Sequence, residues 1–243
     1  MMVLPAPAAY RVPKLGSSVH EYEDAIAWNR RHARFAVADG ASASAFARLW
    51  AQLLVRGYVA GQLRATWLET DLSPLQQQWS CRVEQRELPW YALEQARRGA
   101  FAALAGLTVG LDGTWTALAV GDTCLFQVRD AALQTALPLS EPEAFDSRPL
   151  LLGSRPAANL ALRAQGAIVC AEGTWRPGDA FLLMSDALAA TFLRGGASLD
   201  LLDFDRTAMG FKQWVHRLRT DRLLRNDDVS LLWLNMPPID APA

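Results

Sequence analysis

Short apolar runs separated by polar turns dominate the early part of the chain and return after residue 114. Ala25–Trp28 and Phe35–Ala38 flank the polar Asn29–His32, a pattern typical of two antiparallel strands joined by a tight turn. The same reasoning predicts later strands over residues 115–120, 125–128, 167–170, 180–184 and 229–234.

Apolar residues at helical spacing interrupt these strand patterns. They predict helices over about 44–59 and 208–220, and a short helix over 187–194 that ends at Gly195. A further helix is predicted after Pro89, with one apolar face formed by Trp90, Leu93, Ala100 and Leu104. Residues 61–82 are ambiguous, and residues 138–156, with four prolines, are predicted to form an irregular loop.

The order of these elements indicates the fold class. Strands and helices do not alternate regularly as in βαβ units, which favours antiparallel sheets packed against helices over a doubly wound fold. The chain has 243 residues, of which 51% are hydrophobic and 20% charged, enough to bury one large core. We therefore expect residues 1–243 to form a single domain.

Charge and cysteine content narrow the partners and the compartment. The 24 Lys and Arg residues balance 25 Asp and Glu, so no global field favours nucleic acid or an anionic membrane, and we expect neither as a partner. The longest uncharged run, residues 99–111, is too short to span a bilayer. Three cysteines without a CxxC pair and a start without a basic signal region lead us to expect a cytoplasmic protein.

Acidic residues lie at several of the predicted strand ends. Asp39 ends one strand, Asp186 follows another, and Asp227 precedes the last. Asp24 also precedes a strand, and Asp122 lies in a Gly-Asp-Thr break between two strands. In an antiparallel sheet the end of one strand and the start of its neighbour share an edge, so these carboxylates can converge.

Converging carboxylates repel one another unless a cation neutralises them. Hard oxygen ligands favour Mg²⁺ or Mn²⁺ over Zn²⁺ or copper. A single aspartate beside a strand is more often a turn former or a helix cap, so the prediction of a divalent-metal site rests on the set.

The set also follows a family pattern. Taken in order, the chain resembles the metal-dependent serine/threonine protein phosphatases of type 2C (the PPM type) from about Gly16 to Leu234. The motifs that carry this resemblance are Glu23-Asp24-Ala25, Val37-Ala38-Asp39-Gly40, Val120-Gly121-Asp122-Thr123, Met184-Ser185-Asp186-Ala187-Leu188 and Asp227-Asp228-Val229-Ser230.

The resemblance implies a sandwich of two antiparallel sheets flanked by helices on both faces, here with a reduced flap. It implies that Asp39 bridges two Mn²⁺ or Mg²⁺ ions, that the Gly40 carbonyl binds one ion, and that Asp186 and Asp227 complete the other's shell. Glu23 and Asp24 would hold metal-bound waters, and Asp122 would match a weaker third-metal position. The two cations would acidify a bridging water to hydroxide, which attacks phosphoserine or phosphothreonine in a partner protein.

The chain departs from the family where the phosphate is bound. The arginine that relatives place before Glu-Asp corresponds here to Val19 or His20. His20, Arg148 and Arg155 are the candidate replacements, although none reproduces that arginine by position. The glycine-rich turn or histidine after Asp-Gly is replaced by residues 41–44, Ala-Ser-Ala-Ser. The basic run of Arg217, Arg219, Arg222 and Arg225 is interpreted as a solvated face.

Three hypotheses remain open from the sequence. The first is an active phosphatase acting on a phosphorylated protein, with a cognate Ser/Thr kinase as a candidate partner. The second, motivated by the lost arginine, is a catalytically impaired pseudophosphatase that acts as a metal- or phosphopeptide-binding regulatory module. The third is a metal-free sandwich whose acids are turn formers.

Overall fold

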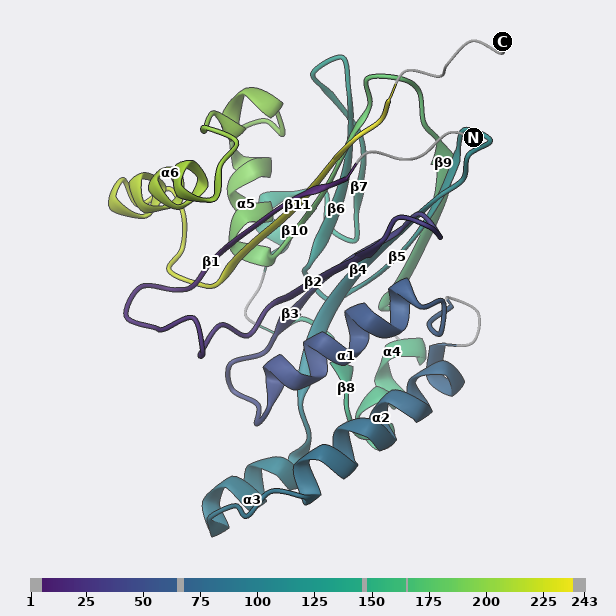
Figure 1. Cartoon of the computed structure of the whole chain (residues 1–243), viewed down its shortest axis with the longest axis vertical. Coiled ribbons are helices and arrows are strands. Elements are labelled where there is room, and N and C mark those ends of the chain that lie inside the picture. The colour runs from purple at the N-terminus through teal and green to yellow at the C-terminus, as the bar shows by residue number, and fades with distance from the viewer. Residues whose placement is uncertain (1–5, 65–67, 146–147, 165, 238–243) are drawn as a thin grey trace.

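Two antiparallel sheets stack face to face in this protein, and helices cover both outer faces (Figure 1). The structure is a computed structural model that describes residues 6–64, 68–145, 148–164 and 166–237. The architecture is the α+β sandwich that the sequence predicted, which confirms the expected fold class.

The first sheet joins the two ends of the described chain. The strand at the start, Ala8–Val12, pairs with the last strand, with Ala8 opposite Trp233. The sheet has the order β1-β11-β10-β6-β7, and every neighbouring pair is antiparallel. Its strands are β1 (Ala8–Val12), β6 (Cys124–Arg129), β7 (Ala132–Leu137), β10 (Ala180–Met184) and β11 (Val229–Asn235).

The second sheet contains the predicted hairpin at one edge. Its strands are β2 (Ala25–Asn29), β3 (Arg34–Gly40), β4 (Phe101–Val109), β5 (Thr114–Val120) and β9 (Ile168–Thr174), in the order β2-β3-β4-β5-β9, with the short β8 (Leu152–Gly153) paired to β4. All of these pairs are antiparallel.

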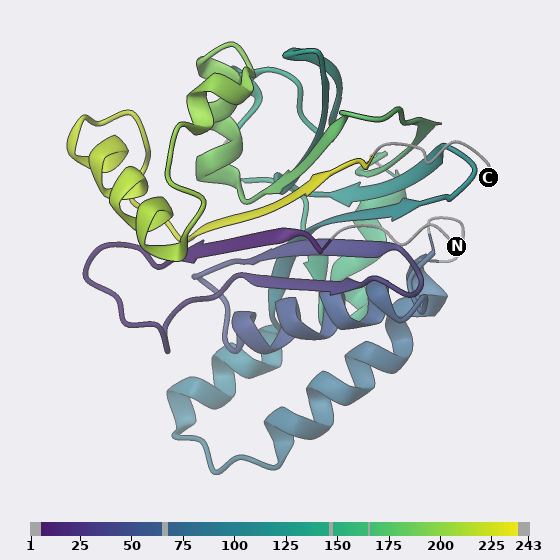
Figure 2. The same ribbon diagram turned by 45° about the horizontal axis from the view of Figure 1, so that its top comes forward.

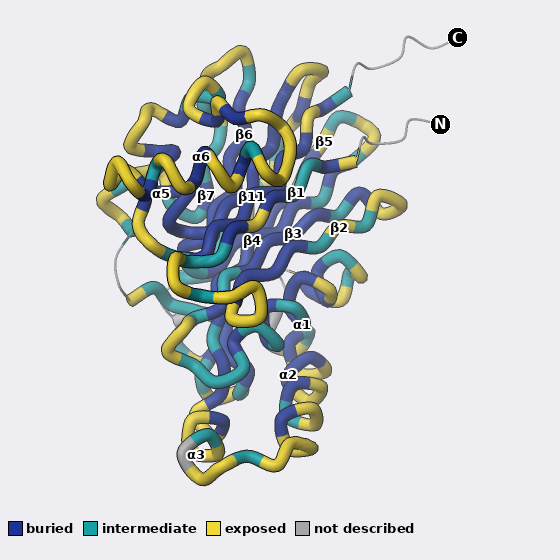
Figure 3. The backbone as a smooth tube through the Cα atoms, turned by 60° about the vertical axis from the view of Figure 1, so that its left-hand side comes forward, coloured by how far each residue is buried: buried dark blue, intermediate teal, exposed yellow. Residues whose placement is uncertain are grey.

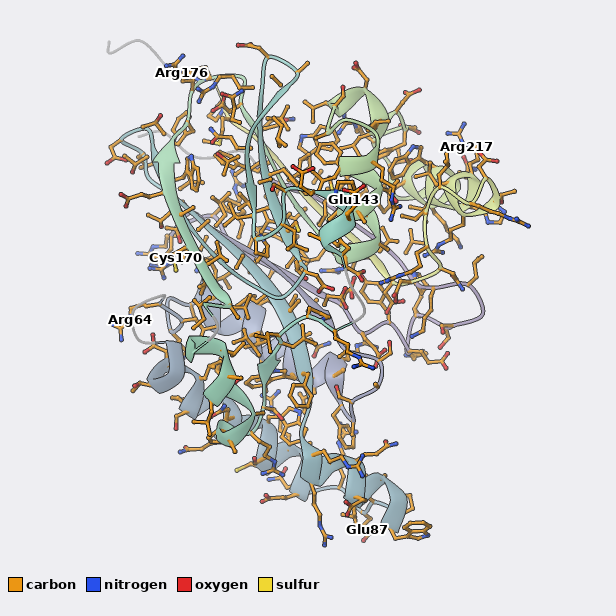
Figure 4. All side chains as sticks on the ribbon, turned by 180° about the vertical axis from the view of Figure 1, so that it is seen from behind. Arg64, Glu87, Glu143, Cys170, Arg176 and Arg217 are labelled. Atoms are coloured by element: carbon orange, nitrogen blue, oxygen red, sulfur yellow. The ribbon has the colours of Figure 1, made fainter. Side chains whose placement is uncertain are left out.

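Helices lie on opposite sides of the sandwich. The helices are α1 (Ala47–Val59), α2 (Leu68–Glu84), α3 (Trp90–Arg98), α4 (Leu160–Ala164), α5 (Asp186–Arg194) and α6 (Ala208–Thr220), with short 3-10 turns at Pro142–Ala144, Pro156–Asn159 and Leu199–Leu202. Figure 2 shows α5 and α6 over the first sheet and α1 directly beneath the second, with α2 beyond α1. Glu87, labelled in Figure 4, lies at the turn between α2 and α3, far from the sandwich.

The alternation of side chains along each strand divides the core into three layers. In β3, Phe35 and Val37 pack between the two sheets, whereas Ala36 and Ala38 face α1. A third cluster lies between the first sheet and helices α5 and α6. Figure 3 shows the buried strands at the centre and the exposed turns around them. The strand ends at the edge of this sandwich are therefore held by packing on both sides.

One helix prediction was wrong. The helix after Pro89 ends at Arg98, because Gly99 adopts a φ of 88° that favours glycine and breaks the helix. Ala100 and Leu104 do not continue it, and Leu104 lies in β4 with both neighbouring strands bonded to it. A continuous apolar run buried on both faces does not distinguish a strand from a helix by its periodicity.

The remaining elements follow the sequence with small shifts. Helix α1 begins at Ala47 rather than near 44, since Phe46 has a left-handed φ of 59°. The ambiguous stretch contains α2, and the proline-rich 138–156 segment is mostly irregular, with β8 as its only strand among the described residues. Trp90, which was placed on an apolar face, is 81% exposed.

Candidate metal centre

Strand register brings the first two acidic residues together. Strands β2 and β3 pair with Ala25 opposite Ala38, so continuing the register by one residue places Asp24 opposite Asp39. Side chains opposite each other in an antiparallel pair have Cβ atoms only about 5 Å apart. Asp39 also shares the face of β3 that carries Phe35 and Val37, so it points into the gap between the two sheets.

Asp24 is buried without a hydrogen-bond partner. Its side chain is only 4% exposed, and neither carboxylate oxygen forms a hydrogen bond within the described structure. Burial raises the pKa of Asp24 to about 8; the nearby Ser230 hydroxyl opposes this rise, and repulsion from Asp228 and Asp186 adds to it. Buried acceptors are almost always bonded, so this carboxylate marks a position where water or a cation belongs.

Four acidic residues act electrostatically on Asp39. Burial is the main reason that the pKa of Asp39 is raised well above its ordinary range, followed by the charges of Asp24, Asp186, Asp122 and Asp227. Asp122 and Asp186 are themselves buried. The tertiary structure therefore brings together the five carboxylates that the sequence placed at strand ends.

Asp186 and Asp227 share a cation from the chain itself. Nη2 of Arg225 donates to Oδ2 of Asp186 in a close ion pair and to Oδ2 of Asp227 at 3.0 Å. The opposing effects of burial and Arg225 leave the pKa of Asp186 raised. The interpretation of Arg225 as part of a solvated face was wrong, although its side chain is 56% exposed.

With this arrangement, the described residues contain no group of three or more His, Cys, Asp or Glu side chains poised to hold a metal ion. The acidic residues are close enough to influence one another's pKa, and two of them, Asp186 and Asp227, both bond Nη2 of Arg225. Repulsion between carboxylates extends over several ångströms, whereas coordination of an ion requires their oxygens to share one ligand position. Within the described residues the carboxylates therefore converge electrostatically without three of them sharing such a position.

Glu23 is held by two neighbours. Oε2 of Glu23 accepts a close hydrogen bond from Oγ of Ser42 and lies 3.5 Å from Nζ of Lys14. Lys14 also donates to Ser42 at 3.0 Å. The turn after Asp39-Gly40, which departs from the family pattern, thus supplies Ser42 to orient an acidic residue at the site.

Asp228 fastens the segment before β2 to the start of β11. Its carboxylate accepts from the backbone N of Lys14 at 2.9 Å and from that of Glu23 at 2.7 Å. Arg219 is buried and donates to the carbonyls of Pro13 and Asp227. Sequence reasoning treated Asp228 as a mild replacement and Arg219 as solvated, and their role became visible only once residues about 200 positions apart were in contact.

Gly40 is required by close approach of the backbone. A Cβ atom at this position would lie 2.8 Å from the carbonyl O of Glu23 and 3.1 Å from Cβ of Ala47. The absence of a side chain lets the Asp39-Gly40 strand end pass next to Glu23. Ala187, which replaces the family glycine after Ser-Asp, does not need a left-handed conformation, because its φ is not positive.

The three candidate phosphate ligands are not brought together. Arg155 donates to Oγ of Ser80 and to the carbonyl of Ala96, and its guanidinium lies over the ring of Trp79. It therefore packs against α2 and α3, and its role at the phosphate stays a prediction. Arg148 and His20 are exposed.

Comparison with known proteins identifies the family. The family model described as protein phosphatase 2C matches residues 20–230, which is most of the chain. The chain belongs to the protein phosphatase 2C family. This confirms the resemblance seen in the sequence motifs and places the protein among the protein phosphatases, which are hydrolases.

Solved structures share the fold at low sequence identity. The serine/threonine phosphatase PstP of Mycobacterium tuberculosis is 18% identical, with a TM-score of 0.64 over 97% of this chain and 100% of that chain. Stp1 of Staphylococcus aureus is 14% identical, with a TM-score of 0.63 over 97% of each chain. PppA, described as a regulatory component of T6SS in Pseudomonas aeruginosa, is 20% identical, with a TM-score of 0.55 over 97% of this chain and 100% of that chain.

Another structure of the PstP catalytic domain contains two manganese ions, and it is 17% identical to this chain with a TM-score of 0.61. A sequence search of curated proteins found no match. Within the described residues, no helix is both long and apolar enough to cross a membrane.

Proposed function

We propose that this phosphatase hydrolyses phosphoserine or phosphothreonine in proteins and depends on Mn²⁺ or Mg²⁺ held between the two sheets. The observation that carries the proposal is Asp24, a buried carboxylate with two unpartnered oxygens opposite Asp39. Such acceptors suit water molecules in the shell of a cation, and a set of carboxylate and carbonyl oxygens suits a hard divalent ion.

In this proposal two cations bind at the acidic centre, and Asp122 offers the position of a third. Asp39, the Gly40 carbonyl, Asp186 and Asp227 would hold the ions, and Glu23 and Asp24 would hold their waters. When bound, the pair of ions would supply a water of lowered pKa and screen the charge of the phosphate ester. Lys14 and Ser42 orient Glu23, while Asp228 holds the backbone of Glu23 in place.

Hydrolysis of a phosphothreonine peptide tests the proposal. We expect turnover only with added Mn²⁺ or Mg²⁺, and a loss of at least about a thousandfold in the Asp39→Asn variant, since metal ions supply several kcal/mol of transition-state stabilisation. The exposed Asp200→Asn variant is the matched control and should keep its activity. Turnover that survives EDTA would contradict a metal-dependent mechanism.

A second function is favoured by Arg225. Its guanidinium already neutralises Asp186 and Asp227, and the segment at Val19 and His20 lacks the phosphate-binding arginine. A catalytically impaired module that binds metal or phosphopeptide would share both features. Titration calorimetry separates the two functions, because metal binding without turnover supports the second and productive turnover excludes it.

The protein partner would be a phosphorylated protein in either case. A cognate Ser/Thr kinase and a cytoplasmic location remain predictions from the sequence. Co-purification of a kinase with the Asp39→Asn variant, from cells that produce this protein, would test the first of them.

A further inference from the structure

A cavity lined by three arginines lies beside the acidic centre. It has a volume of about 370 Å³ and lies between strands β1 and β2, helix α1 and the segment that joins the two strands. Figure 2 shows β1 and β2 running next to each other above α1. The cavity wall includes Arg11 from β1, Arg48 and Arg56 from α1, and Asp24.

Two of the arginines are oriented by backbone carbonyls. Nη2 of Arg11 donates to the carbonyl of Ile26 at 3.0 Å. Nη1 of Arg48 donates to the carbonyl of His20 at 2.9 Å and to that of Val19 at 3.3 Å. Arg48 therefore reaches the positions where relatives would carry the phosphate-binding arginine, although it comes from a helix rather than from that segment.

The positive charge of this cavity is not neutralised. Across the described parts of the chain, no carboxylate forms an ion pair with Arg11, Arg48 or Arg56. Each guanidinium also has more donors than its backbone contacts use. The wall holds one acidic residue, Asp24, against three arginines. A cavity with this balance attracts anions.

Asp24 connects the cavity to the proposed catalytic centre. The same residue lines the cavity and lies opposite Asp39 in the strand pair. The cavity and Asp39 are therefore close enough for one extended peptide to reach both. Its phosphorylated residue would lie at Asp39, and an anionic group a few residues along the same peptide would lie in the cavity. Guanidinium groups bind carboxylates and phosphates through paired, charge-assisted hydrogen bonds.

We propose that the cavity formed by Arg11, Arg48 and Arg56 binds an acidic group of the protein substrate next to the phosphorylated residue. That group is either an Asp or Glu side chain or a second phosphoryl group, because both present the same anionic oxygens. The cavity thereby selects phosphorylation sites in acidic sequences. This selectivity rests on the proposed function, but peptide binding can be measured without turnover.

Fluorescence anisotropy with the Asp39→Asn protein in Mn²⁺ tests the proposal. Three labelled phosphothreonine peptides are compared: one with flanking glutamates, one with alanines in their place, and one with a single flanking phosphoserine. We expect the glutamate or the phosphoserine peptide to bind about tenfold more tightly than the alanine peptide, as for one charge-assisted hydrogen bond. Whichever of these two peptides binds more tightly shows whether the cavity prefers a carboxylate or a second phosphoryl group.

Substitution of the arginines then locates the effect. Arg48→Gln with Arg56→Gln should reduce the tenfold advantage to less than about twofold. Arg56→Gln alone should remove part of it, and this single variant leaves the backbone contacts of Arg11 and Arg48 in place. Arg217→Gln on α6, on the far side of the sandwich (Figure 4), is the control and should retain the full advantage.

Two results would overturn the inference. One is equal binding of the acidic and alanine peptides by the parent protein. The other is an equal loss of affinity for every peptide in the double variant, which would assign the arginines to the phosphothreonine itself. A wild-type protein that discriminates between the peptides but never hydrolyses p-nitrophenyl phosphate with Mn²⁺ would refute the proposed function and support the cavity.

Discussion

Two buried aspartates at opposite ends of the sandwich have opposite environments. Asp179, just before β10, is fully buried and accepts hydrogen bonds from Arg129, Gln127 and the backbone N of Arg176. Burial alone would raise its pKa, but these donors outweigh burial and hold the pKa below its usual range. Asp24 is almost as buried, has no such donor, and has its pKa raised to about 8.

The difference separates a structural acidic residue from a functional one. Asp179 brings its own counterion and stabilises the fold as an anion. Asp24 destabilises the metal-free fold as an anion, so an external group is needed to make its burial favourable. Burial and residue type are nearly the same in the two places; the neighbouring donors around Asp179 and the neighbouring carboxylates around Asp24 distinguish them.

The largest effect is expected from removing Asp179. The Asp179→Ala change leaves Arg129 without its partner, and breaking a buried ion pair in this way should lower the free energy of unfolding by about 3 kcal/mol. Urea denaturation measures the change, with Asp200→Ala as an exposed control that should stay within about 0.5 kcal/mol. A loss smaller than about 1 kcal/mol would mean that Asp179 is not the stabilising member of the comparison.

Asp24→Asn should stabilise the metal-free protein, whereas Asp179→Ala destabilises it. Folding at pH 7 keeps a proton on Asp24 that the unfolded chain releases, and asparagine avoids this cost. We expect the free energy of unfolding to rise by about 2 kcal/mol, at 1.36 kcal/mol for each unit of pKa shift and with allowance for the unsatisfied amide. The stabilisation by added Mn²⁺ should shrink in the same variant, as measured by thermal denaturation. A destabilised variant with an unchanged Mn²⁺ response would instead place Asp24 in the structural class.

Asp24 and Asp179 should each contribute to the pH dependence of the free energy of unfolding. Because the folded pKa of Asp24 is raised from 3.8 to about 8, the folded state binds more protons in this interval and metal-free stability falls as pH rises through it. Asp179 has a lowered pKa, so its contribution is present above about pH 4 and is lost as pH falls further. Denaturation between pH 3 and 9, on the order of one point per unit, should therefore give a flatter dependence between about pH 4 and 8 for Asp24→Asn. An identical slope of stability between pH 4 and 8 in both proteins would remove Asp24 as its cause.

A smaller effect is expected from Arg225, which partly compensates Asp186 and Asp227 as Arg129 compensates Asp179. Arg225→Gln should tighten Mn²⁺ binding by about threefold to tenfold, because the guanidinium competes with the ion for the same oxygens. Since the side chain is 56% exposed, the loss of metal-free stability should stay below about 1 kcal/mol. Titration calorimetry measures the affinity, with Arg217→Gln as the control. Weaker Mn²⁺ binding in Arg225→Gln would show that the arginine assists the ion.

Much of the fold could be predicted because local patterns and tertiary packing agree. The β2–β3 hairpin, α6 and the last strand lie where the alternation of apolar residues placed them. Strand β4 was mistaken for a helix, since a strand buried on both faces has no polar side to reveal its period. The short edge strand β1 was not predicted, because its few residues give no clear alternation of apolar and polar positions.

Some residues of the candidate site could also be predicted from the sequence, and others could not. Strand-end aspartates could be found in the sequence because Asp39, Asp186 and Asp227 abut apolar runs. The partners of those aspartates could not, because Arg225, Asp228 and Arg48 act through contacts across the fold rather than through spacing. Arg225 did carry one weak signal, its position two residues before Asp227.

The sequence by itself determined which acidic residues stand at strand ends and which family motifs they belong to. Only the tertiary structure decided which of them are neutralised, since the counterion of Asp179 comes from a neighbouring strand and that of Asp186 from the segment before β11. The spacing of apolar residues along the chain is a local property, because it follows from which side of each helix or strand is buried. Electrostatic compensation depends on distances of a few ångströms between residues remote in sequence, and strand register and packing set those distances.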